Sequence, residues 1–157
     1  MNSREYEQLM AELAHKLVSR PDREASAIVG WGETNKIVGA STYQHQIDVS
    51  VCSPSKMLLI ECKSWAKSID PEAVLAFAAR VLDIRGANQE REVTGRIITT
   101  LYVTQGVQKI ADYFDLGIDR VISIQEYAVR IWKYVGIGLA EGAIASDKFT
   151  ANVRPHQ

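Results

Sequence analysis

Three charged residues, Asp48, Glu61 and Lys63, are placed where they could act in one site. Asp48 lies in a stretch in which apolar and polar residues alternate, and Glu61-Cys62-Lys63 ends the apolar run 57–60. Because side chains point to opposite faces of a strand in turn, Glu61 and Lys63 are predicted to share one face. If the two strands are neighbours, two carboxylates and an ammonium group come together.

This group of charges favours a divalent metal site. Buried carboxylates are costly unless they are paired or bound to a metal. Mg²⁺ prefers oxygen ligands and keeps several of its waters, so Asp48 and Glu61 are its candidate ligands, with Mn²⁺ as a substitute. Lys63 could then orient a water molecule and stabilise the charge that develops on a phosphate. The three residues therefore predict metal-dependent hydrolysis of a phosphodiester.

The segments that must position these residues begin with a helix and continue with strands. Apolar residues recur at helical spacing over 3–19, which predicts an amphipathic helix. We expect strands over 36–41, 44–51 and 57–63, the first two as a hairpin, and a candidate short strand over 27–31. In the strand 44–51, alternation predicts two faces, one of Ile47, Val49 and Val51 and the other of Gln46, Asp48 and Ser50.

The second half of the chain alternates helices and strands. Asp70 and Pro71 are typical of a helix start, and this helix should run to about residue 84 and stop at Gly86. The further expected elements are a polar loop 87–95, a strand 96–103, a helix 107–114 stopped by Gly117, a strand 120–124 and a last helix opened by Ser123 and Glu126. The order α-βββ-α-β-α-β-α predicts an α/β domain, a mixed sheet flanked by helices, over residues 1–135 with a C-terminal extension 136–157.

The composition is ordinary for a soluble domain, with 46% hydrophobic and 24% charged residues. We expect a cytoplasmic protein without membrane contact, because neither a signal peptide nor an apolar run of about 20 residues is present. Cys52 and Cys62 lack zinc-site spacing with the histidines. The net charge of −1 argues against a strong non-specific DNA binder. It leaves room for a nuclease whose carboxylates are neutralised locally by Mg²⁺.

An acidic residue on one strand followed by Glu-x-Lys at the end of the next resembles the signature of PD-(D/E)XK nucleases. Here the signature reads Ile47-Asp48 and Glu61-Cys62-Lys63, with Ile47 in place of the usual proline. The wider order over residues 3–126 is similar to Mrr-type restriction endonucleases. It includes Tyr6-Glu7 on the first helix, a glycine-containing hairpin and a strand that ends in threonine (YVTQG, 102–106).

The resemblance implies a restriction-endonuclease-like fold and Mg²⁺-dependent cleavage of DNA. It makes Asp48 and Glu61 metal ligands, adds the backbone carbonyl of Cys62 as a further ligand, and makes Lys63 the catalytic lysine. In this family a glutamate on the first helix often supports the metal. Glu7 is our choice, because it lies on the flank of the buried arc while Glu5 and Glu12 project away from it.

Other polar residues are candidates for supporting roles. Gln46 is expected to share the face of Asp48, so we assign it a supporting role there. The candidate DNA contacts are His45, Lys36, Lys67, Thr104 and Gln105, with Arg85 as a further basic residue. Each has a plainer alternative: a turn histidine for His45, a helix N-cap for Thr104, and a solvated surface for the scattered basic residues.

DNA is the expected partner, and a homodimer is expected because one site per chain needs a second copy to cut both strands of a duplex. Two alternatives keep the fold but change the function. One is a catalytically inactive module for nucleic-acid binding or assembly, and the other is a structure-specific nuclease such as a junction resolvase. A structural protein with a chance match to the motif is a third.

Overall fold

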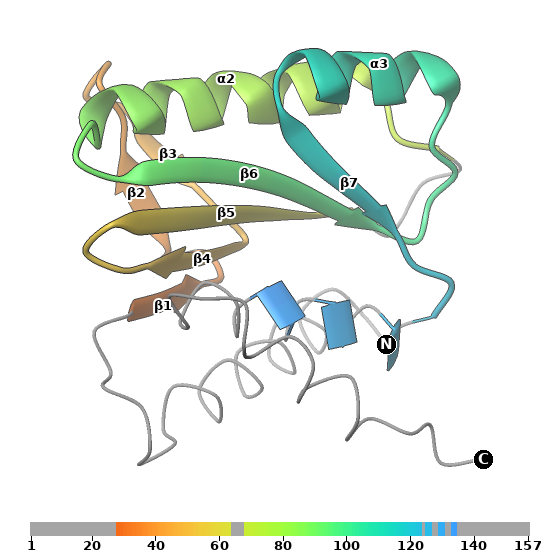
Figure 1. The fold of residues 1–157 in the computed structure, drawn as a ribbon, viewed down its shortest axis with the longest axis horizontal. Coiled ribbons are helices and arrows are strands. Elements are labelled where there is room, and N and C mark those ends of the chain that lie inside the picture. The colour runs from red at the N-terminus through yellow and green to blue at the C-terminus, as the bar shows by residue number, and fades with distance from the viewer. Residues whose placement is uncertain (1–27, 64–67, 124, 127–128, 131–132, 135–157) are drawn as a thin grey trace.

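The computed structural model describes residues 28–63, 68–123, 125–126, 129–130 and 133–134. Its centre is a sheet in the order β1-β4-β5-β6-β7 (Figure 1). These strands are β1 (Ile28–Trp31), β4 (Val49–Cys52), β5 (Lys56–Lys63), β6 (Glu92–Thr99) and β7 (Leu116–Arg120). The pairs β1–β4 and β4–β5 are antiparallel, whereas β5–β6 and β6–β7 are parallel. The expected mixed α/β sheet is confirmed, although five strands rather than three precede the first described helix.

Two helices, α2 (Pro71–Ala87) and α3 (Gln105–Tyr113), connect the parallel strands and cover one face of the sheet (Figure 1). Phe77 and Val81 of α2 pack in one apolar core with Leu59 of β5 and Ile97 of β6. A Cβ on Gly95 would lie within 2.7 Å of Val81, so the glycine lets α2 approach the sheet closely. The packing of this core sets the distance between α2 and β5.

The start of α2 follows the prediction, and its end does not. The side chain of Asp70 accepts a hydrogen bond from the backbone of Glu72, as expected of an N-cap next to a proline. The helix continues through Gly86 to Ala87, and Asn88 caps it by donating to the carbonyl of Ile84 at 2.8 Å. The predicted stop at Gly86 was wrong because Asn88, two residues later, supplies the terminating hydrogen bonds.

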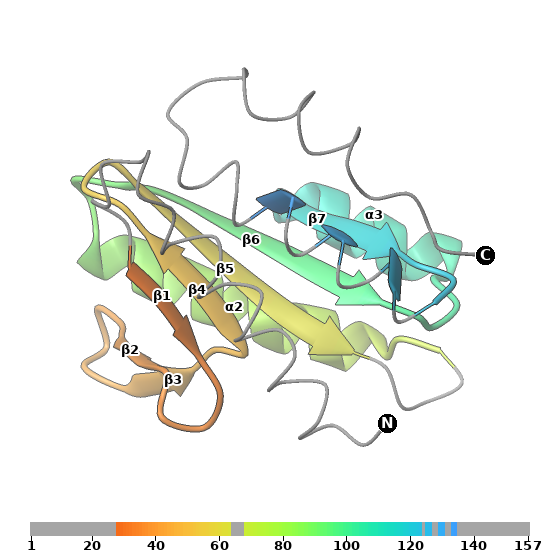
Figure 2. The same ribbon diagram turned by 90° about the horizontal axis from the view of Figure 1, so that it is seen from below.

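The predicted hairpin is confirmed in part, as β2 (Lys36–Val38) and β3 (Gln44–Gln46) pair antiparallel in a separate two-stranded sheet. Figure 2 shows them beside β1 and one end of α2. A continuous strand over 44–51 was wrong, because the chain bends at Ile47 and Asp48. Asn35 pairs with Ile47 through its backbone carbonyl at 3.1 Å and its side-chain amide at 2.8 Å. Ile47 therefore lies in the core under α2, which Val49 and Val51 do not join.

The bounds of three elements in the second half also differ from the prediction. β6 runs over Glu92–Thr99 instead of 96–103, so the polar loop before it is shorter than 87–95. Asp115, with a φ of 55°, ends α3 in place of Gly117. Gly117 lies inside β7, where a Cβ would meet the Arg96 side chain at 2.6 Å. The glycine is needed for this close approach and not for a turn, so the strand lies at 116–120 instead of 120–124.

The expected helix start at Ser123 is supported, since the hydroxyl of Ser123 accepts from the backbone of Glu126 at 3.1 Å. The predicted helix over 3–19 and the extension 136–157 lie outside the described residues. Within the described part of the chain, no helix is long and apolar enough to cross a membrane.

Candidate active site

Asp48 lies in the bend just before β4, and Glu61 lies in β5, the strand that pairs with β4. The pairing of these two strands reaches Val49 opposite Ile60, the residues next to Asp48 and Glu61. Met57 and Leu59, which share the face of Glu61 on β5, lie in the core beneath α2. Glu61 therefore lies on the helix-covered face where that core ends, and the start of β4 brings Asp48 to the same end of β5.

Asp48 is held by backbone contacts on both sides. Its Oδ2 atom accepts a hydrogen bond from the backbone nitrogen of Cys62 at 2.7 Å. Its own carbonyl accepts from the backbone nitrogen of Gly32 at 3.1 Å. These two contacts hold the carboxylate of Asp48, in the bend before β4, against the Glu61-Cys62-Lys63 segment. This geometry places a hard oxygen donor next to the backbone of Cys62.

Glu61 is buried and contacts two cations. The residue is 5% exposed, and its Oε1 atom lies 2.9 Å from the Nζ atom of Lys63. Its Oε2 atom lies 3.4 Å from the Nη1 atom of Arg80, which reaches across from α2. The contact between Glu61 and Lys63 follows from their shared face on β5, as the sequence predicts. The contact with Arg80 had not been predicted.

The donor set fits a hard divalent cation. The carboxylate of Asp48 accepts a hydrogen bond from the backbone of Cys62, the residue that follows Glu61 in β5. Mg²⁺ is commonly bound through one or two carboxylates, with water and substrate phosphate completing its ligands. No group of three or more His, Cys, Asp or Glu residues forms a metal cluster among the described residues. Two carboxylates leave most ligand positions of such an ion to other groups, such as water or a substrate phosphate.

Several residues predicted to support the site or to contact DNA have other partners in the structure. Gln46 lies exposed in β3, with Lys36 as its cross-strand partner in β2, so it does not share the strand of Asp48. Thr104 caps α3 by accepting from the backbone of Val107 at 3.2 Å, the alternative role considered for it. Gln105 begins that helix and is exposed. Glu7 and Lys67 lie outside the described residues.

His45 and Arg85 also take part in contacts that fix the fold. The Nε2 atom of His45 lies 2.6 Å from the Oδ2 atom of Asp83 on α2. Ser41 donates to the same carboxylate from its backbone at 2.8 Å and from its hydroxyl. The hydrogen bonds from Ser41 and then His45 lower the pKa of Asp83 to about 2. The three residues tie the β2–β3 hairpin to α2, while Arg85 donates to the carbonyl of Val93 at 3.0 Å.

A second polar cluster lies on the opposite face of the sheet. Arg96 is the parallel partner of Ile60 and so faces away from α2. Its Nε atom lies 2.8 Å from Oδ2 of Asp119, and its guanidinium lies 4.2 Å from the ring centroid of Tyr134. Burial alone would lower the pKa of Arg96, but the hydrogen bond to Asp119 raises it.

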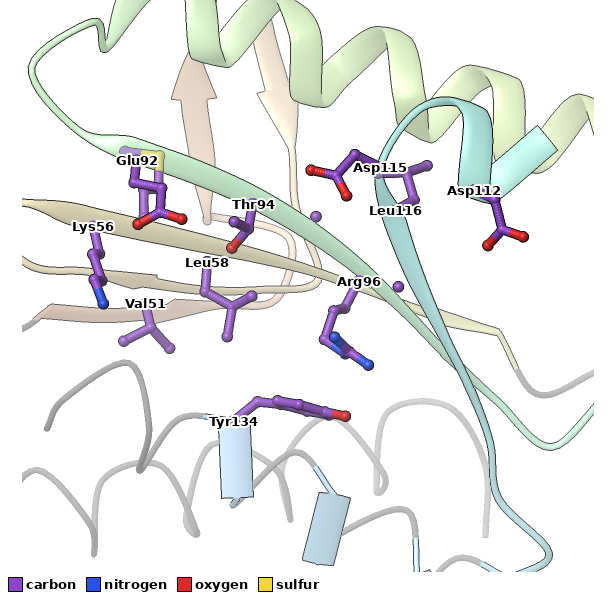
Figure 3. A pocket seen from close by; sticks show the side chains of 13 residues that line it. Val51, Lys56, Leu58, Glu92, Thr94, Arg96, Asp112, Asp115, Leu116 and Tyr134 are labelled. Atoms are coloured by element: carbon purple, nitrogen blue, oxygen red, sulfur yellow. The ribbon is translucent and has the colours of Figure 1, made fainter. Parts of the chain in front are cut away.

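The other two members of this cluster show the matching shifts. Burial opposes the change at Asp119, yet hydrogen bonds from Arg96 and Tyr134 hold its pKa below the usual value. Burial and then the hydrogen bond to Asp119 raise the pKa of Tyr134 to about 12. Arg96 and Tyr134 also line a cavity of about 540 Å³ together with Leu58 and Thr94 (Figure 3). This cavity is on the face of the sheet away from Asp48 and Glu61.

Comparison with known proteins identifies fold likeness only. The crystal structure of AF1548, a protein of unknown function, matches with a TM-score of 0.51 and 17% identity over 72% of this chain and 56% of that chain. MspJI restriction endonuclease, in complex with a 27-mer oligonucleotide, matches with a TM-score of 0.42 and 16% identity over 95% of this chain and 36% of that chain. The chain thus spans little more than half of AF1548. No protein-family model and no curated protein matches the sequence.

Proposed function

We propose that this protein is a Mg²⁺-dependent DNA endonuclease with a site formed by Asp48, Glu61 and Lys63. The observation that carries the proposal is the hydrogen bond at 2.7 Å from the backbone of Cys62 to the carboxylate of Asp48, because Cys62 lies between Glu61 and Lys63, which contact each other at 2.9 Å. A chance match to the motif would not require Asp48 to contact the Glu61-Cys62-Lys63 segment. DNA as the substrate class rests on the resemblance of the motif to PD-(D/E)XK nucleases.

Each residue has a distinct role in the proposed reaction. Asp48 and Glu61 would hold the ion, with the backbone carbonyl of Cys62 as a further ligand. A bound Mg²⁺ supplies positive charge to the phosphate and makes a bound water a better nucleophile. Lys63, whose side chain is 39% exposed, can reach both solvent and the carboxylate. It would orient the attacking water and stabilise negative charge in the transition state.

Two copies of the chain would be required to cut both strands of a duplex in one binding event. We therefore include a homodimer in the proposal. Light scattering with and without DNA measures the assembly that cleaves. A monomer on DNA that makes only single-strand nicks would contradict this part of the proposal and leave the metal site unaffected.

The test of the proposed function is nicking of supercoiled plasmid in Mg²⁺, with EDTA as the blank. Asp48→Asn should abolish cleavage because it removes a charged ligand at nearly constant side-chain volume. Asp112→Asn, the same change on an exposed residue of α3, is the matched control and should cleave like the wild type. Equal cleavage by wild type and Asp48→Asn would refute the proposed site. Branched and linear DNA compared in the same assay separate a junction-resolving enzyme from a general endonuclease.

One observation favours a second candidate, a non-catalytic module of the same fold. Both carboxylate oxygens of Glu61 contact cations already, at 2.9 Å and 3.4 Å, as in an ion pair that serves only the fold. Mn²⁺ binding measured by electron paramagnetic resonance discriminates the two. The endonuclease must bind the ion, and the non-catalytic module has no need to.

A further inference from the structure

Arg80 is a charged residue at a place where its helix packs on the core. Phe77, three residues before it, and Val81, directly after it, are each 1% exposed, and α2 is apolar over most of its length. The side chain of Arg80 is 36% exposed and reaches Oε2 of Glu61 on β5. Arg80 therefore brings a positive charge from α2 to the rim of the candidate site.

The two cations on Glu61 are held unequally. Lys63 lies 2.9 Å from Oε1, within the range of a charge-assisted hydrogen bond, whereas Arg80 lies 3.4 Å from Oε2. Lys63 is also on the same strand as Glu61, so its position is fixed by β5 itself. Arg80 joins from another layer and its contact is the longer one. Of the two contacts, the one to Arg80 is the easier to give up.

A divalent ion bound to Glu61 would repel the positive charges of Lys63 and Arg80, so the carboxylate cannot bind the ion and hold both side chains as strongly as before. An ion at Glu61 therefore competes with Arg80. A guanidinium released from a carboxylate matches the oxygens of a phosphate diester in the same planar fork geometry. The substrate phosphate is the nearest group of that chemistry in the proposed reaction.

We propose that Arg80 holds Glu61 while the site is free of metal, and binds a DNA phosphate once Glu61 is bound to a divalent ion. This inference rests on the proposed function and adds a substrate-binding residue to it. It also couples metal and DNA binding, because the ion frees the cation that then contacts DNA. A purely structural ion pair between Arg80 and Glu61 would produce no such coupling.

The test measures metal and DNA binding separately in Arg80→Gln, without using cleavage as a readout. Mn²⁺ affinity is measured without DNA by electron paramagnetic resonance. DNA affinity is measured in EDTA and in Ca²⁺, over a series of salt concentrations. Lys56→Gln is the matched control, because Lys56 is exposed at the opposite end of β5 and the charge change is the same.

Arg80→Gln should bind Mn²⁺ roughly two- to fivefold more tightly than the wild type, because its competitor is gone. In Ca²⁺ it should bind DNA about tenfold more weakly, with a salt slope smaller by about one. In EDTA the loss of DNA affinity should be much smaller, because in the wild type Glu61 then holds the Arg80 guanidinium away from DNA. Lys56→Gln should leave Mn²⁺ affinity unchanged and show the same DNA affinity ratio to the wild type in EDTA and in Ca²⁺.

Unchanged or weaker Mn²⁺ binding by Arg80→Gln would overturn the inference while leaving the proposed function intact. An equal loss of DNA affinity in EDTA and Ca²⁺ would overturn it as well. Absence of Mn²⁺ binding by the wild type would overturn the proposed function itself, and the inference with it. If Arg80→Gln does not fold, Arg80→Lys serves as the second variant. It should keep the wild-type Mn²⁺ affinity and lose part of the Ca²⁺-dependent DNA affinity, and an unchanged DNA affinity would refute the role of the guanidinium.

Discussion

The two faces of one sheet carry two ionic clusters of opposite design. On the face under α2, Glu61 contacts two cations, Lys63 and Arg80, and the carboxylate of Asp48 bonds to the backbone of the next residue, Cys62. On the other face, Arg96 pairs with Asp119 at 2.8 Å. Tyr134 completes that second cluster, since its ring packs against Arg96 and its hydroxyl donates a hydrogen bond to Asp119.

The two clusters differ in how their groups are paired. In the Arg96 cluster the guanidinium bonds directly to Asp119, and the neutral phenol of Tyr134 donates to the same carboxylate. In the Glu61 cluster one carboxylate is shared by two cations. An added divalent cation would compete with Lys63 and Arg80 for Glu61, and an added anion would compete with Glu61 for these two side chains. We infer that the Arg96 cluster supports the fold and that the Glu61 cluster is built to change partners. Matched substitutions in the two clusters test this difference.

The largest expected effect is on divalent-ion binding. Glu61→Gln should lower Mn²⁺ affinity and Mg²⁺-dependent cleavage by more than about 100-fold, because it removes a charged ligand at nearly constant volume. Asp119→Asn, the same chemical change on the other face, should leave Mn²⁺ affinity within about twofold of the wild type, because its cluster has no part in the metal site. Titration of both variants in parallel makes the comparison. A similar loss in both would erase the distinction between the clusters.

For the free energy of unfolding, Asp119→Asn should have the larger effect and Glu61→Gln the smaller one. Asp119→Asn should lower the free energy of unfolding by about 1–2 kcal/mol, since it weakens a partly buried hydrogen-bonded pair with Arg96. Glu61→Gln should change it by less than about 1 kcal/mol, because its two cation partners are more than one-third exposed and water can solvate them without the carboxylate. Urea denaturation without divalent ions measures both. A larger loss for Glu61→Gln would identify Glu61 as chiefly structural.

Tyr134 gives the Arg96 cluster a signature at high pH. Its pKa is raised to about 12 in the folded protein, so the folded state favours the protonated phenol. The resulting stabilisation should be complete below the ordinary tyrosine pKa of about 10 and should be lost as the pH rises toward 12. The stability difference between wild type and Tyr134→Phe, followed from pH 8 upward, should shrink over that window. A constant difference would contradict the raised pKa of Tyr134, which burial and then the hydrogen bond to Asp119 cause.

Asp83 gives the smallest expected effect, at low pH. Its pKa is lowered to about 2 from the ordinary value of 3.8, so its hydrogen bonds to Ser41 and His45 stabilise the fold above pH 3.8. That contribution should disappear as the pH falls toward 2, whereas Asp83→Asn should lack it throughout. Hydrogen exchange of the β2–β3 hairpin amides, compared in the two proteins at pH 6, reports the same tether. Equal protection would show that other contacts hold the hairpin.

Glu61 and Lys63 could be predicted from the sequence because their placement depends only on residues close to them in the chain. Alternation along β5 places Glu61 and Lys63 on one face, and the hairpin and turn residues bring the preceding strand beside it. Asp48 was predicted as part of a continuous strand, whereas the chain bends there. The contacts from Asn35 to Ile47 that cause the bend join residues with no recognisable pattern in the sequence.

Arg80 could not be placed because its role depends on tertiary packing. A single basic residue within the apolar stretch of α2 was the available signal, but an arginine on a helix is ordinarily exposed. Its contact with Glu61 exists because Gly95 lets α2 lie close to the sheet and the core sets the rotation of the helix. The pairing of His45 with Asp83 was missed for the same reason, because a hairpin and a helix distant in sequence meet only in the fold.

The most direct test of the account is a crystal of the protein soaked in Mn²⁺ and measured at a wavelength where manganese scatters anomalously. We predict an anomalous peak in contact with carboxylate oxygens of both Asp48 and Glu61. A fully soaked crystal with no peak at these two residues, or with peaks only elsewhere, would contradict the assignment of this pair as a metal site.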